Sequence, residues 1–202
     1  MKKFFSLILS AFLFLNIFCS CKNKETTFTA YIDEAGFYNN RISVYTADDT
    51  VDFDAADVTF TSGSFKPKSF GIVKITYSKI STKESVPKIT ASKVEYLKDA
   101  KYRTILKEEY EKLNKDDFVL IDVRSTDIYK KMGHLQNAIN ISAKKINPKI
   151  KTKFLPDLNK KIVVYGSSDK NSKIASLFLL TLGYTNVYDL GGIEGKDYKL
   201  VI

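Results

Sequence analysis

Residues 162–172, IVVYGSSDKNS, form an apolar run followed by a short polar loop that should open a helix. A corner between a strand and a helix is a common place for a nucleophile, because the helix N-terminus stabilises negative charge there. The residue at this turn is Gly166, which has no side chain to attack, accept or carry a group. The pattern therefore predicts a site that lacks a nucleophile at its centre.

The chain offers little to replace that nucleophile. Ser167 and Ser168 carry hydroxyls that would need a neighbouring base. His134 is the single histidine of the chain, and one histidine without an arranged nucleophile makes no catalytic dyad. Both cysteines, Cys19 and Cys21, lie near the N-terminus. We predict no catalytic residue, no metal site and no cofactor.

The N-terminus, MKKFFSLILSAFLFLNIFCSC, has two lysines, an apolar run and small residues around the cysteines. This layout is typical of a secretory signal peptide, because the apolar run is too short for a comfortable membrane span. Its end resembles a bacterial lipobox, which implies cleavage after Ser20 and a lipid on Cys21. We expect residues 1–20 to be a lipoprotein signal peptide; the alternative is ordinary secretion with Cys21 as a free thiol. Several acyl chains, such as palmitate, would hold the chain on the extracytoplasmic side of an envelope membrane.

Net charge separates the chain into two units. The formal charge is +9 at pH 7. Residues 22–97 contain ten basic and ten acidic residues, whereas residues 98–202 contain twenty basic and thirteen acidic residues. A hydrophobic content of 44% is enough for one or two cores without disulfides. We predict a two-domain α+β protein, with a β domain at 21–97 and an α/β domain at 98–202.

The first unit shows the two-residue periodicity of β-strands. The segments with this pattern are 28–32, 41–46, 71–80 and 88–97. Turn residues separate them at 33–36, 39–40, 62–63, Pro67 and Pro87. About five strands in this length predict a small antiparallel barrel or sandwich, similar to the oligonucleotide/oligosaccharide-binding (OB) type.

We expect no nucleic-acid partner for the β unit, because such binding needs a positive groove with stacking aromatic rings. Its charges cancel, and residues 48–57, DDTVDFDAAD, are strongly acidic. Its aromatic residues are better explained as core and edge packing. The acidic segment could offer oxygen ligands to calcium, but it lacks the glycine and the spacing of a calcium loop.

The pattern changes from Lys98 onward. Residues 98–114 predict an amphipathic helix, or a short strand followed by one. Apolar runs without alternation predict strands buried on both faces at 118–123, 138–142, 161–166 and 186–190. Residues 171–184 predict a helix that ends at Gly183. Strands that alternate with helices predict a parallel sheet with helices on both faces.

The basic segment 144–153, KKINPKIKTK, allows two interpretations. It is best explained as a solvated helix face. The alternative is contact with anionic lipid headgroups near the anchor.

Residues 122–142, DVRSTDIYKKMGHLQNAINIS, resemble the rhodanese-like domain. That pattern has Asp-Val-Arg at a strand end, an acidic and aromatic pair, Gly-His, and a short Ala-Ile-Asn-Ile strand. This chain has one extra residue between Tyr129 and Gly133. Residues 162–193 follow the second half of the pattern, so the resemblance spans residues 102–198 and implies the rhodanese-like fold.

The resemblance also implies what the loop has lost. In active members a cysteine follows the strand and holds a sulfane sulfur as a persulfide, which the loop amides stabilise. In this chain the cysteine falls on Gly166, a loop glycine on Asp169 and an arginine on Asn171, while Ser172 matches. Asp169 brings in a carboxylate, and Lys170 is only a partial replacement for the arginine. We predict a degenerate loop comprising Gly166, Ser167, Ser168, Asp169, Lys170, Asn171 and Ser172.

Three residues outside the loop are expected to support it. The resemblance implies that Asp122 and Arg124 support the loop by charge and hydrogen bonds, and that His134 is structural at a turn between a strand and a helix. Lys196 stands where the family often has tryptophan. We expect a lipid-anchored envelope protein whose rhodanese-like domain is non-catalytic and binds a protein or a small anion. The alternative is a sulfurtransferase, of the thiosulfate or persulfide type, that retains activity by an unrecognised route.

Overall fold

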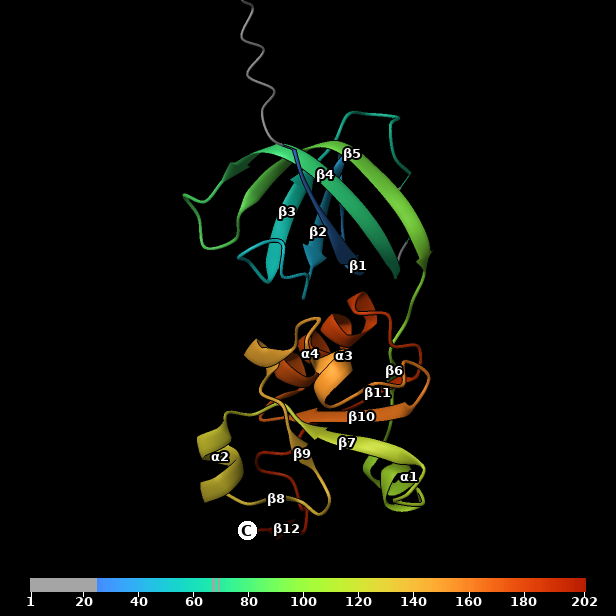
Figure 1. Ribbon diagram of the computed structural model, residues 1–202, viewed down its shortest axis with the longest axis vertical. Helices are drawn as coiled ribbons and strands as arrows, with labels where there is room; N and C mark the ends of the chain where they lie inside the picture. Colours follow the sequence, from blue (N-terminus) through green and yellow to red (C-terminus); the bar gives the residue numbers. More distant parts are fainter. Residues whose placement is uncertain (1–24, 67, 69) are drawn as a thin grey trace, which may run out of the picture.

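The computed structural model describes residues 25–66, 68 and 70–202. An N-terminal β barrel packs on a C-terminal α/β unit, and helix α4 (Asp169–Thr181) lies between the barrel and the sheet (Figure 1). The predicted signal peptide and Cys21 lie outside the described residues. Within those described ranges, no helix is long and apolar enough to cross a membrane.

Five strands close the barrel in the order β1-β2-β3-β5-β4, with β4 returning to β1. The strands are β1 (Thr26–Tyr38), β2 (Arg41–Tyr45), β3 (Ala55–Thr59), β4 (Gly71–Ser81) and β5 (Lys88–Asp99). Neighbouring strands are antiparallel except β3 and β5, which pair in parallel. The predicted small barrel is therefore present, with one parallel pairing.

One local prediction in the barrel was wrong and one strand was missed. Residues 33–36 are not a turn, because β1 continues through them with a shift of register between Ile32 and Phe37. The turn predicted at 39–40 is confirmed, and Asn39 and Asn40 have φ values of 42° and 61° in the left-handed region that asparagine tolerates. Strand β3, which begins inside the acidic segment, was missed, because it is only five residues long and its alternation rests on two apolar residues, Ala56 and Val58.

The barrel core consists of the inward-facing residues of all five strands. Ile42, Val58 and Ile75 are completely buried. The Phe28 ring meets the rings of Phe53 and Tyr77 edge to face, with centroids 5.3 Å and 5.9 Å apart. These aromatic residues therefore pack the core, as predicted.

A five-stranded sheet, all of whose pairings are parallel, forms the centre of the second unit in the order β6-β11-β10-β7-β9. Its strands are β6 (Arg103–Thr104), β7 (Phe118–Asp122), β9 (Ile139–Asn140), β10 (Lys161–Gly166) and β11 (Val187–Gly192). Strands β8 (His134–Leu135) and β12 (Leu200–Val201) form a separate antiparallel pair. The predicted parallel sheet is confirmed.

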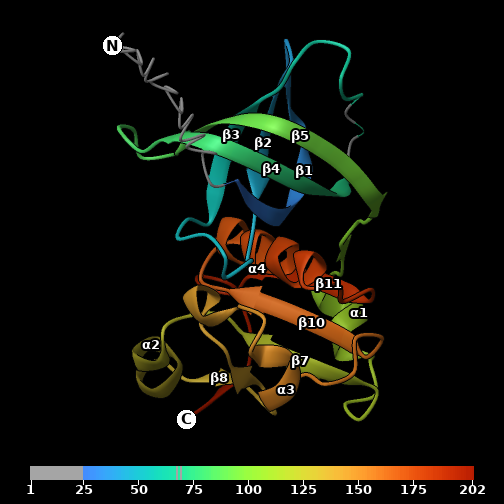
Figure 2. The same ribbon diagram turned by 45° about the horizontal axis from the view of Figure 1, so that its top comes forward.

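Helices cover both faces of this sheet, as predicted (Figure 1). Figure 2 shows α4 lying between β10 and the barrel. One face carries α4 together with α3 (Ile150–Lys153), which follows a 3-10 turn at Ala143–Lys145. The other face carries α1 (Lys107–Glu111) and α2 (Thr126–Lys131). The segment 98–114 is therefore a strand end, a short strand and one short helix, which is the second of the two predicted alternatives.

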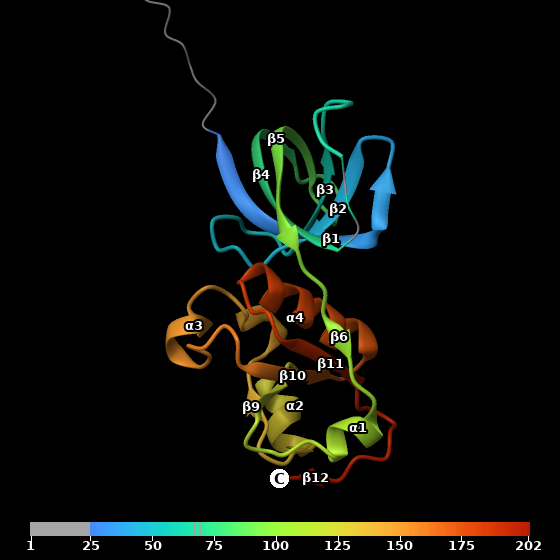
Figure 3. The ribbon, with the colours of Figure 1, turned by 90° about the vertical axis from the view of Figure 1, so that its right-hand side faces the viewer.

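The barrel and the sheet share one hydrophobic core across α4. Tyr31, Ala47 and Ile72 of the barrel belong to the same buried cluster as Leu177 and Phe178 of α4. Strand β1 begins at the end of the barrel away from α4, and β5 descends to the α/β unit (Figure 3). The two units therefore pack through shared apolar contacts rather than being joined by a linker alone.

Candidate functional site

The loop singled out in the sequence joins β10 to α4. Gly166 is the last residue of β10, and Ser168 is the N-cap of the helix. The Ser168 carbonyl accepts hydrogen bonds from the amides of Asn171 at 3.1 Å and Ser172 at 3.2 Å. The Ser168 hydroxyl also accepts a long bond from the Asn171 amide, at 3.4 Å. The Ser172 bond is the regular first bond of the helix, whereas the Asn171 amide is one of the otherwise free N-terminal amides, and it is engaged by Ser168.

The space beside Gly166 is already filled. A Cβ atom placed on Gly166 would lie 3.2 Å from the Ser172 nitrogen and 3.3 Å from both Asn171 Cβ and Val123 Cγ2. These separations are shorter than ordinary van der Waals contact, and Gly166 itself is buried. The first turn of α4 therefore packs close to the position where the resemblance places the family's cysteine.

Asp169 is turned toward β11 rather than into an open anion site. Its Oδ1 accepts the Gly192 amide at 2.7 Å and lies 3.2 Å from Lys196 Nζ. The Gly192 bond and then the Lys196 charge lower the pKa of the Asp169 carboxyl. The carboxylate remains 78% exposed. The negatively charged Asp169 carboxylate therefore lies at the N-terminus of α4, where it opposes the binding of an anionic ligand.

The loop backbone lies directly on Gly192. A Cβ atom on Gly192 would be 2.5 Å from Ser168 Cα and 2.7 Å from the Ser167 carbonyl oxygen. Gly191, beside it, has φ +83°, which favours glycine. The glycine pair therefore allows the loop to approach the edge of β11 closely.

Asp122 and Arg124 form a buried ion pair at the end of β7. Arg124 Nη2 lies 2.6 Å from Asp122 Oδ2, and it also donates to the Gly133 carbonyl at 2.7 Å. Tyr165 of β10 accepts the Leu135 amide through its hydroxyl at 3.1 Å, and burial, then Asp122, raises the pKa of this phenol. Among the described hydrogen bonds, none joins Asp122 or Arg124 to residues 166–172. If Asp122 and Arg124 support the loop, they do so indirectly, through the pairing of β7 with β10.

His134 lies away from the loop. It belongs to β8, not to a turn between a strand and a helix as the resemblance implied. Its ring stacks on Tyr129 with centroids 4.0 Å apart, and its Nδ1 lies 3.0 Å from the Leu135 carbonyl oxygen. No described hydrogen bond connects it to Ser167 or Ser168, so the structure does not assemble a serine and histidine dyad from these residues.

Sequence reasoning missed one pairing at the site. Asp169 and Lys196 were each noted as a departure from the family pattern, and the structure shows that they contact each other. They lie 27 residues apart, so no local periodicity links them. The one signal in the sequence was that Asp169 and Lys196, both departures from the family pattern, carry opposite charges.

The acidic segment of the barrel shows ordinary structural roles. Asp48 Oδ2 accepts the Thr29 amide at 2.8 Å, and its Oδ1 accepts the Thr50 hydroxyl at 2.7 Å. Asp57 pairs with Arg41 at 2.7 Å. Within the described part of the chain, no group of three or more potential ligands is arranged to hold a metal ion.

Comparison with known proteins adds the evolutionary context. The family model for the rhodanese-like domain matches residues 106–195. Thiosulfate sulfurtransferase PspE from Escherichia coli (strain K12) is 38% identical over 74 residues, which are 37% of this chain and 69% of that protein. A solved rhodanese with anions from E. coli is 35% identical and covers 41% of this chain and 95% of its own, with a TM-score of 0.37. The solution structure of protein hp1203 from Helicobacter pylori 26695 is 30% identical and covers 45% and 77%, with a TM-score of 0.37. Through residues 106–195, this chain belongs to the rhodanese-like domain family.

Proposed function

We propose that the chain is a lipid-anchored envelope protein whose rhodanese-like domain is non-catalytic and binds a protein partner. The observation that carries the proposal is the close packing around Gly166, where Ser172, Asn171 and Val123 surround the position of the missing side chain. A scaffold that keeps its sheet and helices but loses its reactive group retains surfaces for recognition.

The test is co-purification of partners with the lipidated full chain from its own cells. Lys170→Glu reverses the exposed charge in the first turn of α4, and Lys83→Glu makes the same change in the remote turn after β4. Loss of a partner with Lys170→Glu, but not with Lys83→Glu, would support binding through the loop. Identical partners for both variants and the original chain would contradict it.

Binding of a small anion is the weaker form of this proposal. It is disfavoured because the Asn171 amide is engaged by Ser168 and the Asp169 carboxylate already lies at the helix N-terminus. If sulfate or phosphate binds near Lys170 at all, binding should be weak, and calorimetry should detect little or no heat with either ion. A dissociation constant below about 1 mM for either ion, together with loss of binding in Lys170→Met, would favour anion binding instead.

Sulfurtransferase activity is the second candidate, and the name of the E. coli relative is the observation that favours it. The chain lacks a cysteine at residue 166 and has none after Cys21. We expect thiosulfate-to-cyanide transfer by the purified chain to remain at background. Transfer clearly above background, abolished by a substitution in residues 166–172, would replace the non-catalytic proposal.

The lipid anchor needs its own test, because Cys21 lies outside the described residues. We expect Cys21→Ser to move the protein from the membrane fraction to the soluble fraction and to abolish labelling with palmitate. Cys19→Ser is the matched control and should change neither. Membrane retention and labelling by Cys21→Ser would disprove the anchor.

We further propose that the barrel is of the OB type. Its five strands, the closure of β1 on β4 and the parallel pairing of β3 with β5 support this assignment. Cross-strand nuclear Overhauser contacts that lack the pairing of β3 with β5 or of β1 with β4 would contradict it.

A further inference from the structure

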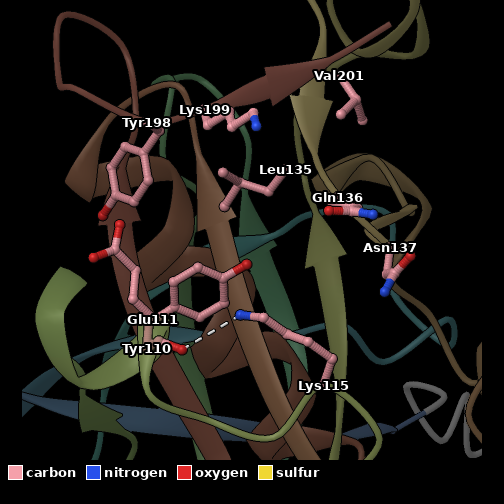
Figure 4. Close-up of a pocket in the computed structure, with 9 residues that line it drawn as sticks. All are labelled: Tyr110, Glu111, Lys115, Leu135, Gln136, Asn137, Tyr198, Lys199 and Val201. Atoms are coloured by element: carbon pink, nitrogen blue, oxygen red, sulfur yellow. Dashed lines mark hydrogen bonds between the residues drawn. The ribbon is translucent and has the colours of Figure 1, made fainter.

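A cavity of about 180 Å³ lies on the face of the sheet opposite α4 (Figure 4). It is formed where α1, the turn after β8 and the segment before β12 meet, so three distant parts of the chain contribute to it. This volume suits a small metabolite rather than a nucleotide or a large cofactor.

Lys115 brings an ammonium group into this cavity without a carboxylate to balance it. Its Nζ lies 4.0 Å from the centroid of the Tyr110 ring and 3.5 Å from the Tyr110 carbonyl oxygen, the bond drawn in Figure 4. Burial lowers the pKa of Lys115, and the charge of Glu111 only partly opposes this effect. No ion pair of Lys115 is present among the described residues. A partly desolvated cation of this kind gains most from an anionic partner.

Three charged residues line the cavity: Glu111, Lys115 and Lys199. Glu111 pairs with Lys107 at 3.0 Å. Neither Lys115 nor Lys199 has an ion pair within the described ranges, so the lining presents one paired carboxylate and two lysines without an ion pair.

The walls of the cavity are suited to a small organic body. The Tyr110 and Tyr198 rings and the Leu135 side chain supply apolar surface. Gln136 and Asn137 also line the cavity and carry polar side chains, and none of the described hydrogen bonds involves the Asn137 side chain. A ligand could thus combine apolar contact with hydrogen bonds at its polar end.

We propose that this cavity binds a small organic carboxylate, with the carboxylate group at Lys115 and the apolar part against Tyr110 and Leu135. The site is separate from the loop at 166–172, so the proposal does not depend on whether that loop binds a partner. Recognition rests on a charge-assisted bond to the lysine ammonium and on burial of a short carbon chain.

The probe is butyrate, followed through the backbone amide signals of the isotope-labelled full chain in detergent. We expect butyrate to shift the signals of residues 135–137 and 198–201, and uncharged butyramide, of nearly the same shape, to shift them far less. Lys115→Met keeps the length of the side chain and should weaken butyrate binding at least about tenfold. Lys151→Met, on the other face of the sheet, should leave binding unchanged.

Three results would overturn the proposal. These are the absence of shifts at tens of millimolar butyrate, equal binding of butyramide, and unaltered binding by Lys115→Met. If Lys115→Met proves unstable, Lys199→Met serves as the second variant and should weaken butyrate binding in the same direction. Normal butyrate binding by a folded Lys199→Met would then count against the proposal.

Discussion

Gly166 lies in a tightly packed position at the end of β10. A Cβ atom there would lie only 3.2–3.3 Å from Ser172, Asn171 and Val123, so these neighbours would have to shift slightly to admit a side chain. Under the non-catalytic proposal, this packing is one reason why a thiol at residue 166 would not be sufficient for activity. Asp169 is a second obstacle to anion binding at this loop, because its carboxylate lies at the N-terminus of α4, where it contacts Gly192 and Lys196.

Restoring the missing thiol alone should fail. We expect Gly166→Cys to give no thiosulfate sulfurtransferase activity and to destabilise the chain by about 1–2 kcal/mol, because the first turn of α4 must move to admit the side chain. Activity assays and urea denaturation measure both effects. Ser167→Cys, at the neighbouring half-buried position, is the control for a thiol in the loop without this overlap. Strong recovery of transfer in Gly166→Cys would show that Asp169 and Asn171 do not block the chemistry.

The Asp169 contacts predict a pH effect on stability. The folded state lowers the pKa of this carboxyl, so its stabilising effect is complete above the unfolded pKa, about 3.9, and is lost as the pH falls through the folded value. Asp169→Asn should therefore be less stable than the original chain at pH 7, and the difference should shrink below about pH 4. Denaturant titrations at both pH values measure it. A difference that is constant with pH would contradict the role of the charge.

At the scale of elements, α4 is unusual because it is buried on several sides. Ala175, Leu177, Phe178, Leu179 and Leu180 are all buried, between the sheet on one side and the barrel on the other. Helices at the surface of a domain keep a polar face, whereas a helix that is apolar all round needs cover on all sides. The barrel provides that cover.

Two serines of α4 provide a matched pair for testing this environment. Ser176 is completely buried, and its hydroxyl has no hydrogen-bond partner among the described residues. Ser172 is equally buried, but its hydroxyl donates to the Asp169 carbonyl at 3.1 Å. We expect Ser176→Ala to be neutral or stabilising by up to about 1 kcal/mol and Ser172→Ala to be destabilising by about 1 kcal/mol. Thermal unfolding distinguishes them, and a clear loss of stability in Ser176→Ala would mean that its hydroxyl is satisfied.

The elements differed in how far the sequence could predict them. Strands β4 and β10 were predicted within a residue of their observed bounds, because alternation and unbroken apolar runs are local signals. The prediction of a turn at 33–36 was wrong, because β1 continues through these glycine and charged residues with a shift of register. The Asp169 and Lys196 contact depends on the fold that brings α4 beside the end of β11, and it has no local signal.

At the scale of the whole molecule, the two units share a core. The buried cluster that includes Tyr31 and Ile72 of the barrel continues through α4 into the sheet residues Ile162 and Val164. Neither unit can be removed without exposing apolar surface on the other. Point variants are therefore better tests of function here than deletion of residues 98–202.

This shared core predicts cooperative unfolding. We expect one transition, with the same midpoint for tyrosine fluorescence and for far-ultraviolet circular dichroism. A fragment containing only residues 98–202 should aggregate or bind hydrophobic dyes, because the barrel-facing side of α4 would be exposed. Two separate transitions, or a soluble and folded fragment, would show that the interface contributes little.

The starting point of β1 determines which way a tethered molecule would face. Strand β1 begins at Thr26, at the end of the barrel away from α4, and Cys21 precedes it by only five residues. Five residues span at most about 18 Å, so a lipid on Cys21 would hold that end of the barrel near the bilayer. The rhodanese-like domain would then project into the aqueous space, with the barrel as its spacer. The lysines of 144–153 would lie away from the headgroups, and any partner of the domain would approach from solution.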